Sequence, residues 1–519
     1  MSAFTYPGVY IEELPSAVHT ITGVATSVAA FVGWADQGSI TQATLVESWS
    51  DYQTEFGGLD SRTLLGYAVN QFFANGGSQA YIVRLVYTGA KTATETPAAT
   101  AVSSFKIGGL LVWAANPGAW GNNIAVTVTL NPSDATRFSI LVQMLSTTGG
   151  PAVTLENFVN LSFSPTDPQG NYVVTVVDSE SNYITFIDPS SPGTVPGPPT
   201  GSPAAMSQTA LKANSGNDGT VLAPNNSNFE NALTAANGGV NLLSNVFFNL
   251  LCVPGETTVS VVTALQGFCA NPSNRAFYIV DPPSTATYSS LSGGPGAIVT
   301  APNAANSALY FPWISAPDPL AGNRPNLFPP CGFVAGIYAA TDAARGVWKA
   351  PAGIDAGLTG INGLQYVLTD QQNGDLNTKA INCLRSFPVY GNIVWGARTL
   401  LGNDQVGSQW KYVPIRRFAL FLESSLYQGT QWAVFEPNDE TLWGQLRLNI
   451  GAFMQGLFLQ GAFQGTTPQQ AYFVKCDSEN NPQSSIDMGI VNVTVGFAPL
   501  YPAEFVVIQI QQMAGQSAS

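Results

Sequence analysis

The spacing of apolar residues near the N-terminus predicts a strand, a helix and a second strand. The apolar run Thr26–Gly33 is typical of a buried strand. Apolar side chains at helical spacing follow between Asp60 and Gly77, and alternating ones from Gln79 to Val86 predict another strand. Residues 20–88 are therefore expected to form one strand, helix and strand unit.

The texture of the sequence changes between Tyr87 and about Asn228, where Thr, Ser, Gly and Pro dominate. Short alternating runs, of which Ile124–Leu130 and Tyr172–Val177 are the clearest, are predicted to be strands separated by turns. This pattern is typical of an inserted β-sandwich. The proline-rich residues Asp188–Pro203 predict an exposed loop or linker, because they cannot hold a helix or a central strand.

Longer apolar strands and helices alternate between Phe229 and about Gly353. Val246–Val253 and Arg275–Asp281 are predicted strands, and Val259–Cys269 between them is a predicted helix. Strand and helix in alternation favour an α/β fold with a largely parallel sheet.

The clearest predicted helix opens at Asn438, which is the expected N-cap. Asp439 and Glu440 follow it, where acidic groups suit the positive end of a helix. Two predicted strands, Ile490–Phe497 and Phe505–Gln511, lie close to the end of the chain. The apolar face of the helix is made by Trp443, Leu446, Ile450, Phe453 and Leu457.

Composition favours a protein whose surface is covered by copies of itself. The 519 residues, enough for roughly three domains, contain only 10% charged residues, whereas about 25% is usual for a soluble domain. Neutral polar faces can be buried between subunits without stranding charges. The net charge of −14 argues against nucleic acid as a partner, since phosphate binding requires clustered Lys and Arg.

Candidate chemistry is sparse. His19 is the only histidine, which removes most metal sites and most acid–base dyads that work near neutral pH. No phosphate-binding Gly-x-x-x-x-Gly-Lys-Ser/Thr loop is present. We expect no cofactor, no metal and no enzymatic activity. Five widely spaced cysteines without a Cys-x-x-Cys pair are predicted to be buried free thiols: Cys252, Cys269, Cys331, Cys383 and Cys476.

No apolar run approaches the roughly 20 residues that cross a bilayer, and the N-terminus lacks a basic region leading into an apolar one. We therefore expect that the protein does not insert into a membrane and that it assembles in the cytoplasm.

A series of short motifs resembles the tail sheath proteins of contractile phages and phage-like injection systems over nearly the whole chain. In order, they are Tyr6–Glu13, Gly23–Gly33, Phe72–Gly77, Ala80–Arg84, Asn116–Ile124, Tyr310–Trp313, Pro330–Tyr338, Arg345–Pro351, Arg416–Arg417, Trp432–Glu440, Gly461–Gly465, Tyr472–Asp477 and Pro502–Val507.

The resemblance implies a multidomain α/β and α+β fold with exchanged terminal strands. The expected parts are an N-terminal linking arm (1–22), the N-terminal part of the core (23–88), the inserted β-sandwich (89–228), a subtilisin-like α/β domain (229–400) and a C-terminal sheath domain (401–519) with a terminal linking strand.

The implied function is that of a subunit that forms stacked, hexameric rings around an inner tube and contracts to drive the tube through a target envelope. Expected partners are copies of itself, the inner tube protein, baseplate and tail-terminator proteins, and sister sheath proteins.

Strand exchange would use two terminal segments. In each, the alternative is an edge strand packed on its own domain. The segments are the arm residues Val9, Tyr10, Ile11, Glu12 and Glu13, and the strand residues Val506, Val507, Ile508, Gln509 and Ile510.

The resemblance also implies that the helix after Asn438 lies on the inner side of the sheath. Asp439, Glu440 and Arg447 are therefore candidates for contact with the tube, with solvent exposure or pairing within the subunit as the alternative.

Two rival functions remain open. A passive shell or fibre subunit would also polymerise. A subtilisin-like hydrolase would need a base for Asp281 or Ser284, and His19 lies too early in the chain to serve, so Asp281 is interpreted as a turn carboxylate at a strand end.

Overall fold

The computed structural model describes residues 19–88, 102–107, 109–146, 149–187, 195–199, 202–211 and 216–509. The chain divides into two compact units, one made of residues 26–345 and 350–416 and the other of residues up to 25, 346–349 and from 417 onward. The predicted arm residues Val9–Glu13, Ile510 and most of the predicted linker Asp188–Pro203 lie outside the described residues.

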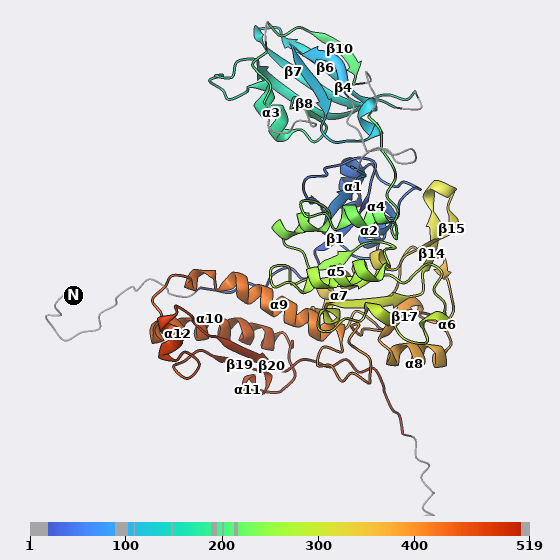
Figure 1. Cartoon of the computed structure of the whole chain (residues 1–519), viewed down its shortest axis with the longest axis vertical. Helices are drawn as coiled ribbons and strands as arrows, with labels where there is room; N and C mark the ends of the chain where they lie inside the picture. The colour runs from blue at the N-terminus through green and yellow to red at the C-terminus, as the bar shows by residue number, and fades with distance from the viewer. Residues whose placement is uncertain are drawn as a thin grey trace, which may run out of the picture. The chain divides into compact units, whose positions relative to one another are not determined.

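The larger unit is organised by an eight-stranded sheet of order β18-β17-β13-β12-β11-β1-β3-β2, whose six central strands are parallel (Figure 1). The largely parallel sheet that the sequence predicts is thus confirmed. Only the edge strands β18 and β2 run antiparallel. The strands are β1 (Ala29–Trp34), β2 (Thr44–Val46), β3 (Ala80–Leu85), β11 (Leu250–Cys252), β12 (Phe277–Val280), β13 (Ser307–Phe311), β17 (Ile381–Phe387) and β18 (Gly391–Val394).

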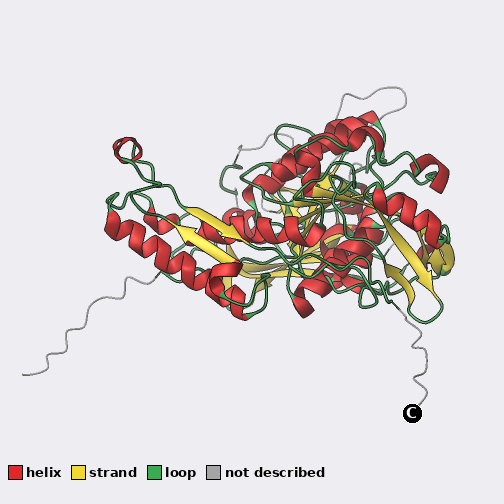
Figure 2. Ribbon diagram, turned by 90° about the horizontal axis from the view of Figure 1, so that it is seen from below, coloured by secondary structure: helices red, strands yellow, loops and turns green. Residues whose placement is uncertain are grey.

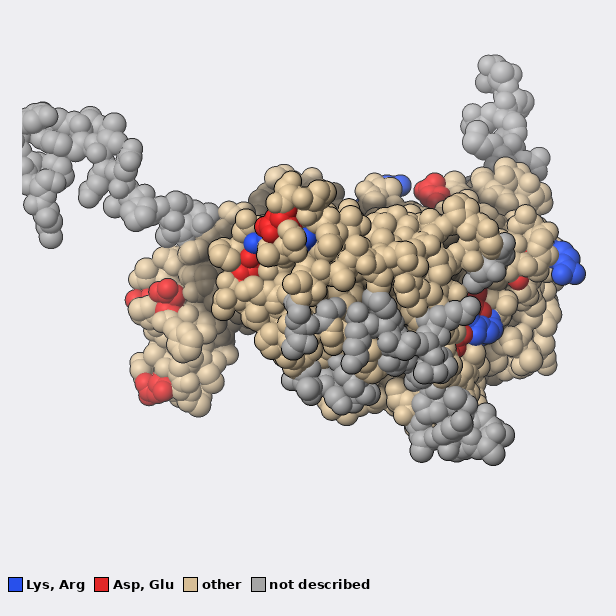
Figure 3. All heavy atoms as spheres, turned by 90° about the horizontal axis from the view of Figure 1, so that it is seen from above, with Lys and Arg blue, Asp and Glu red and all other residues tan. Residues whose placement is uncertain are grey.

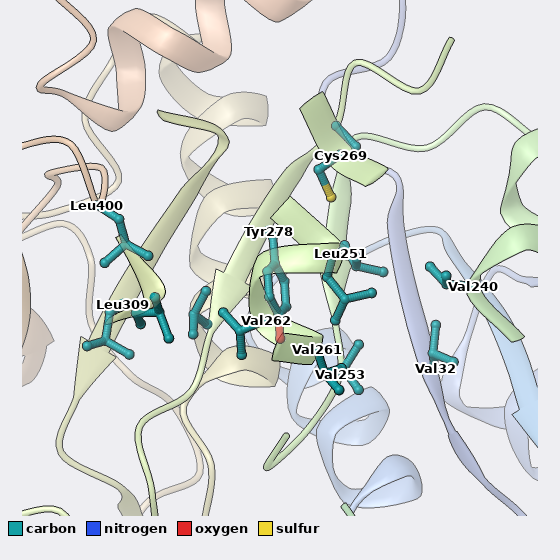
Figure 4. Packing of buried hydrophobic residues seen from close by; sticks show 14 of the residues in the cluster. Val32, Val240, Leu251, Val253, Val261, Val262, Cys269, Tyr278, Leu309 and Leu400 are labelled. Atoms are coloured by element: carbon teal, nitrogen blue, oxygen red, sulfur yellow. The ribbon is translucent and has the colours of Figure 1, made fainter. Parts of the chain in front are cut away.

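Both faces of this sheet are buried, which explains why its strands are almost continuously apolar. Along β1, Ala30, Val32 and Trp34 point into one core, and Phe31 packs on Phe72 at the opposite face. The first core is completed by α4 and α5. Figure 4 shows Val261, Val262 and Cys269 of α5 in this core. The helices of this unit are α1 (Trp49–Phe56), α2 (Leu65–Ala74), α4 (Ser227–Leu233), α5 (Val259–Ala270), α6 (Tyr288–Leu291), α7 (Cys331–Arg345) and α8 (Asp370–Thr378).

Helices α2 and α7 pack closely on the opposite face because α7 carries glycine where the two backbones meet. A Cβ added at Gly332 would lie 2.4 Å from Ala68 O, and one at Gly336 would lie 2.7 Å from Phe72 O. The small residues within Pro330–Tyr338 are therefore explained by helix–helix contact.

The insertion has its own apolar core between two antiparallel sheets, β10-β6-β7-β8 and β4-β5-β9. The prediction that Tyr172–Val177 is a strand is wrong, because this stretch opens helix α3, whose Val173, Val174 and Val177 are buried at helical spacing. Packing has overridden the strand preference of consecutive valines. The elements are β4 (Val102–Ile107), β5 (Leu110–Ala114), β6 (Ile124–Asn131), β7 (Asp134–Met144), β8 (Val153–Ser162), α3 (Val173–Glu180), β9 (Ile184–Thr185) and β10 (Met206–Ala210).

The smaller unit contains the long helix α10 (Glu440–Leu459) and all but the first four residues of the long helix α9 (Val413–Gly429) (Figures 1 and 2). It also contains a two-stranded sheet of β19 (Tyr472–Lys475) and β20 (Thr494–Phe497). Two short helices, α11 (Pro468–Ala471) and α12 (Gln483–Asp487), flank β19 in the sequence.

The core of the smaller unit draws on three separate stretches of chain. Ile21 comes from the N-terminal part and Val347 from the loop after α7, and both pack with Phe418 of α9. Trp348 meets the Phe418 ring edge to face, with centroids 5.8 Å apart. This packing accounts for the apolar residues of Arg345–Pro351.

The start of α10 differs by one residue from the prediction. Asp439, and not Asn438, caps the helix, because its carboxylate accepts the Leu442 N–H at 3.0 Å. Asn438 accepts the indole N–H of Trp443 at 2.9 Å and donates to Ile490 O at 3.1 Å, so it ties the start of the helix to the loop after α12.

The glycine contact between α2 and α7 can be tested with a pair of helical glycines. Gly336→Ala should lower the free energy of unfolding by about 1–3 kcal/mol, because the added methyl meets backbone that cannot move freely. Gly374→Ala in α8 is the matched control: it faces open space and should raise stability by up to about 1 kcal/mol. Denaturant unfolding followed by fluorescence measures both. Equal effects of the two substitutions would contradict the close-packing account.

Candidate assembly surfaces

The two-stranded sheet of the smaller unit is apolar on one face and partly exposed on the other. Val474 and Val495 are paired and lie against the core formed with α9 and α10. On the other face Phe473, 56% exposed, lies across Gly496, where an added Cβ would stand 2.1 Å from its ring. The alternation of Tyr472–Lys475 is a signal from which this strand could have been predicted.

Both outer edges of the β19–β20 sheet are open within the described part of the chain. Ala498 N–H donates to Ala471 O at 2.8 Å, and from this point the bonded pairs alternate, so the N–H groups of Val474 and Val495 point to the two outer edges. An isolated two-stranded sheet is marginal in water, and added strands would stabilise it.

The edge of strand β15 is different, because it is blocked. Strand β15 (Arg324–Phe328) pairs with β14 (Ile314–Asp318), which in turn pairs with β16 (Gly363–Leu364). Pro325 has no N–H to donate, and the Leu327 N–H is taken by the side chain of Asn326 at 2.9 Å. Proline and local capping are common protections of an exposed edge. Strand addition is therefore favoured at β19–β20 over β15.

The segment after β20 carries apolar side chains into solvent. Pro499 makes a bridge to Phe463, and further on Phe505, Val506, Val507 and Ile508 are 74–81% exposed. Residues 505–509 form no strand in this single chain, so they do not pack as an edge strand on their own subunit. The strand from Phe505 that would pair with a neighbouring subunit stays a prediction. Four consecutive apolar residues in solvent indicate a surface that another molecule covers.

The three candidates for tube contact are brought together at the start of α10. Asp439 caps the helix, and Arg447 forms an ion pair with Glu440 at 2.7 Å and donates to Cys476 O. Pairing within the subunit, the alternative for these residues, is thus present for Glu440 and Arg447. Contact with the tube stays a prediction.

Asp281 is a buried structural carboxylate. It follows β12, and its oxygens accept the N–H of Gly255 at 3.0 Å and the N–H of Cys331, the first residue of α7, at 2.8 Å. Burial raises the pKa of the Asp281 carboxyl to about 6 because it penalises the charged form. Asp281 therefore joins a loop to the N-terminus of α7. The only histidine, His19, belongs to the other unit, where its ring stacks on Trp432 with centroids 4.1 Å apart.

The predicted buried thiols are confirmed, since all five cysteines are free and buried. Among the described residues no cluster of His, Cys, Asp or Glu could hold a metal ion. The described helices include none that is both long and apolar enough to span a bilayer. On the face in Figure 3, charged side chains form small separate groups on a surface that is otherwise uncharged.

Open strand edges, an exposed apolar terminal segment and a charge-poor surface are typical of a subunit of a larger protein assembly. Two family models identify the family. The phage tail sheath protein central domain matches residues 225–400, and the phage tail sheath C-terminal domain matches residues 405–513. Together they match more than half of the chain, which belongs to the phage tail sheath family.

Two named relatives agree. The tail sheath protein of Vibrio phage KVP40 is 26% identical over 188 residues, which are 36% of this chain and 26% of the relative. A protein of Pseudomonas aeruginosa named as a prophage major tail sheath protein is 28% identical over 264 residues, 49% of this chain and 62% of the relative. The matched stretches thus span less than two thirds of either relative.

Solved structures show the same fold along the whole chain. The sheath of the extracellular contractile injection system PVC, in the contracted state, has a TM-score of 0.59 at 23% identity and matches over 99% of both chains. The contracted helical sheath of the anti-feeding prophage (AFP) has a TM-score of 0.58 at 22% identity over 98% of this chain and 100% of that chain. A chain of the AFP baseplate scores 0.57 at 21% identity over 99% and 100%. The fold is therefore the mixed α/β multidomain fold of contractile sheath proteins.

The position of Asp281 predicts a specific pH dependence of stability. The unfolded chain has an Asp pKa of about 3.9, so the folded state binds this proton more tightly, and the contribution of Asp281 falls as the pH rises from about 4 to about 6. Asp281→Asn should remove that part of the slope and also lower stability overall, since Asn cannot accept both N–H groups. Asp355→Asn, with a side chain 73% exposed, should keep the wild-type profile.

Denaturant midpoints at several pH values measure these slopes. If Asp281→Asn loses the same stability between about pH 4 and about pH 6 as the wild type, Asp281 does not titrate in this range and the account of its burial is wrong.

Proposed function

We propose that this protein is the subunit of a contractile sheath, which polymerises as helically stacked rings around an inner tube and shortens to drive that tube forward. The observation that carries the proposal is the pairing of a donor and an acceptor in one subunit: the exposed apolar residues 505–508 and the open edges of β19–β20. Family membership and the fold of contracted sheaths support it.

In this proposal each terminal segment adds a strand to the sheet of a neighbouring subunit. A donated strand of about five residues makes several backbone hydrogen bonds, each worth roughly 0.5–1.5 kcal/mol, so one arm contributes several kcal/mol. The arm residues Val9–Glu13 and the strand residues Val506–Ile510 are the proposed donors. Because the outward N–H groups of Val474 and Val495 lie on opposite edges, one sheet can receive two strands.

Contraction requires no nucleotide in this proposal. Strand links of several kcal/mol keep neighbouring subunits connected, whereas the charge-poor faces between subunits make weaker contacts that can break and re-form. The extended sheath is then a trapped packing that releases free energy when its subunits rearrange, and assembly on a baseplate and tube sets the barrier.

The proposed partners are further copies of the chain in hexameric rings, the inner tube protein, baseplate and terminator proteins, and sister sheath proteins. The likeness to a chain of the AFP baseplate structure supports association with a baseplate. We further propose assembly in the cytoplasm into a phage tail or a phage-like injection particle. The central sheet with helices on both faces supports the subtilisin-like assignment of residues 229–400 as a scaffold, with Asp281 in a structural role.

Trimming the ends tests strand exchange. Removal of residues 1–15 or of residues 505–519 should abolish long tubes, because each deletion removes one proposed donor strand, while the trimmed chain stays a folded monomer. Electron microscopy and circular dichroism measure the two outcomes. Full-length protein should form tubes or rings with a wide lumen. Fibres or closed shells would favour the passive shell instead, and normal tubes from trimmed protein would refute the arms.

A single proline separates strand pairing from simple apolar contact. Val507→Pro or Ile508→Pro removes one N–H, and because neighbouring N–H groups point to opposite sides of a strand, one of the two should block polymerisation far more than the other. Val507→Thr, the control, keeps both the N–H and the strand preference and should polymerise. Equal effects of the two prolines would indicate that residues 506–508 bind through their side chains alone.

A further inference from the structure

Residues 19–24, which we call the strap, lie along α9 and run antiparallel to it. At one end of the strap, Val24 N–H donates to the hydroxyl of Ser425 at 3.1 Å. At the other end, His19 stacks on Trp432, just beyond the end of the helix, with ring planes 15° apart. The contacts of the strap therefore move towards the C-terminal end of α9 as the chain is followed back to His19.

Two glycines let the strap lie close to the helix. A Cβ added at Gly23 would stand 2.8 Å from the Phe421 ring, and one at Gly429 would stand 2.6 Å from the side chain of Ile21. A side chain at either position would collide with these groups unless the strap moved away from α9. Ile21 is 5% exposed and packs in the core of the smaller unit, so burial fixes the middle of the strap.

The stack of His19 on Trp432 ties down the first residue that the structure describes. Trp432 packs on the apolar cluster at the start of α10, so the His19 ring lies on a side chain that a core holds in place. His19 itself is exposed, and its contact therefore adds little to the stability of the fold. The ends of a chain are poorly ordered unless they are tied down. The stack thus serves to place the chain that comes before it.

The chain before His19 contains the proposed donor strand Val9–Glu13. Glu13 is six positions before His19, so it can lie at most about 20 Å from the stack. Without the stack the nearest fixed residue is Ile21, and the limit rises to about 28 Å. The effective concentration of a tethered strand falls roughly as the −3/2 power of the tether length, so it would fall by about 1.5-fold. The arm would also lose its fixed starting direction.

We propose that the strap sets the point and the direction from which the N-terminal arm leaves the subunit. In this role His19 is a positioning residue, whose ring fixes the start of the arm on Trp432. The inference rests on the proposed function, in which Val9–Glu13 adds a strand to a neighbouring subunit. An arm that is held ready in this way loses less chain entropy when its strand pairs.

The mobility of the arm in the free subunit tests the anchor. A fluorescent dye on Ser16→Cys labels the full-length chain at one place, because its own five cysteines are buried. Time-resolved anisotropy of the dilute subunit should show added fast motion of the dye in His19→Ala, since the next fixed residue is then Ile21. His19→Phe keeps an aromatic ring and should restore the wild-type decay. Thr20→Ala, at the exposed neighbouring residue, is the control and should behave as the wild type.

The critical concentration for tube formation, measured by sedimentation, tests what the anchor does in assembly. His19→Ala should raise this concentration by about 1.5- to 2-fold, whereas His19→Phe and Thr20→Ala should keep the wild-type value. All three variants should keep the wild-type unfolding midpoint, because both residues are exposed. A general loss of stability therefore cannot produce this pattern.

The two measurements separate this inference from the proposed function. If His19→Ala leaves the dye as restricted as in the wild type, or leaves the critical concentration unchanged, the strap does not position the arm. Tubes formed by wild-type protein would then still support the proposed function. If the wild type forms no tubes, the proposed function fails, and the dye in His19→Ala alone decides whether His19 fixes the start of the arm.

Discussion

The fold depends on the pairing of β1 with β11, two strands that are more than 200 residues apart in the sequence. Ala29–Phe31 lies in register with Leu250–Cys252, and Val28 N–H donates to the side chain of Asn249 at 3.0 Å, across 221 residues. Until this pairing forms, the sheet is divided into two halves, neither of which covers its apolar strands. The chain between β3 and β11 leaves the sheet and returns to it, and it forms a separate domain with its own core.

Arg84, at the end of β3, holds the place where the insertion begins. Its guanidinium is buried and donates to four carbonyl oxygens, those of Ala35, Asp36, Gly38 and Pro117, at 2.7–2.8 Å. Burial lowers the pKa of Arg84 to about 10, so the group remains charged at neutral pH. One side chain thus fixes a core loop and the entry to the insertion together.

The sheets of the two units differ in how far they are covered. The large sheet is covered on both faces, whereas the small sheet of β19 and β20 has two edges with which no described strand pairs. In the proposed mechanism the closed core moves as a rigid body, and the open sheet receives strands from neighbouring subunits. A sheath that shortens requires both properties, since its subunits must change neighbours' contacts without unfolding. The charge-poor surface suits the same requirement, because neutral faces can slide without breaking ion pairs.

The sequence by itself determined the elements with strong periodicity and local signals, which are β1, α2, β3, α5 and β12. It also predicted that the sheet is largely parallel. It also determined the buried thiols, and the order of its motifs along the chain identified the family. Only the tertiary structure decided the rest. Val173–Val177 has the composition of a strand but forms a helix, because a helix places Val173, Val174 and Val177 together in the core of the insertion. Asp439 caps α10 in place of Asn438, because the side chain of Asn438 bonds to the Trp443 indole and to Ile490 O. The local sequence pattern shows neither of these two bonds. Interactions between neighbouring residues can be inferred from the sequence, whereas contacts between remote segments exist only once the chain has folded.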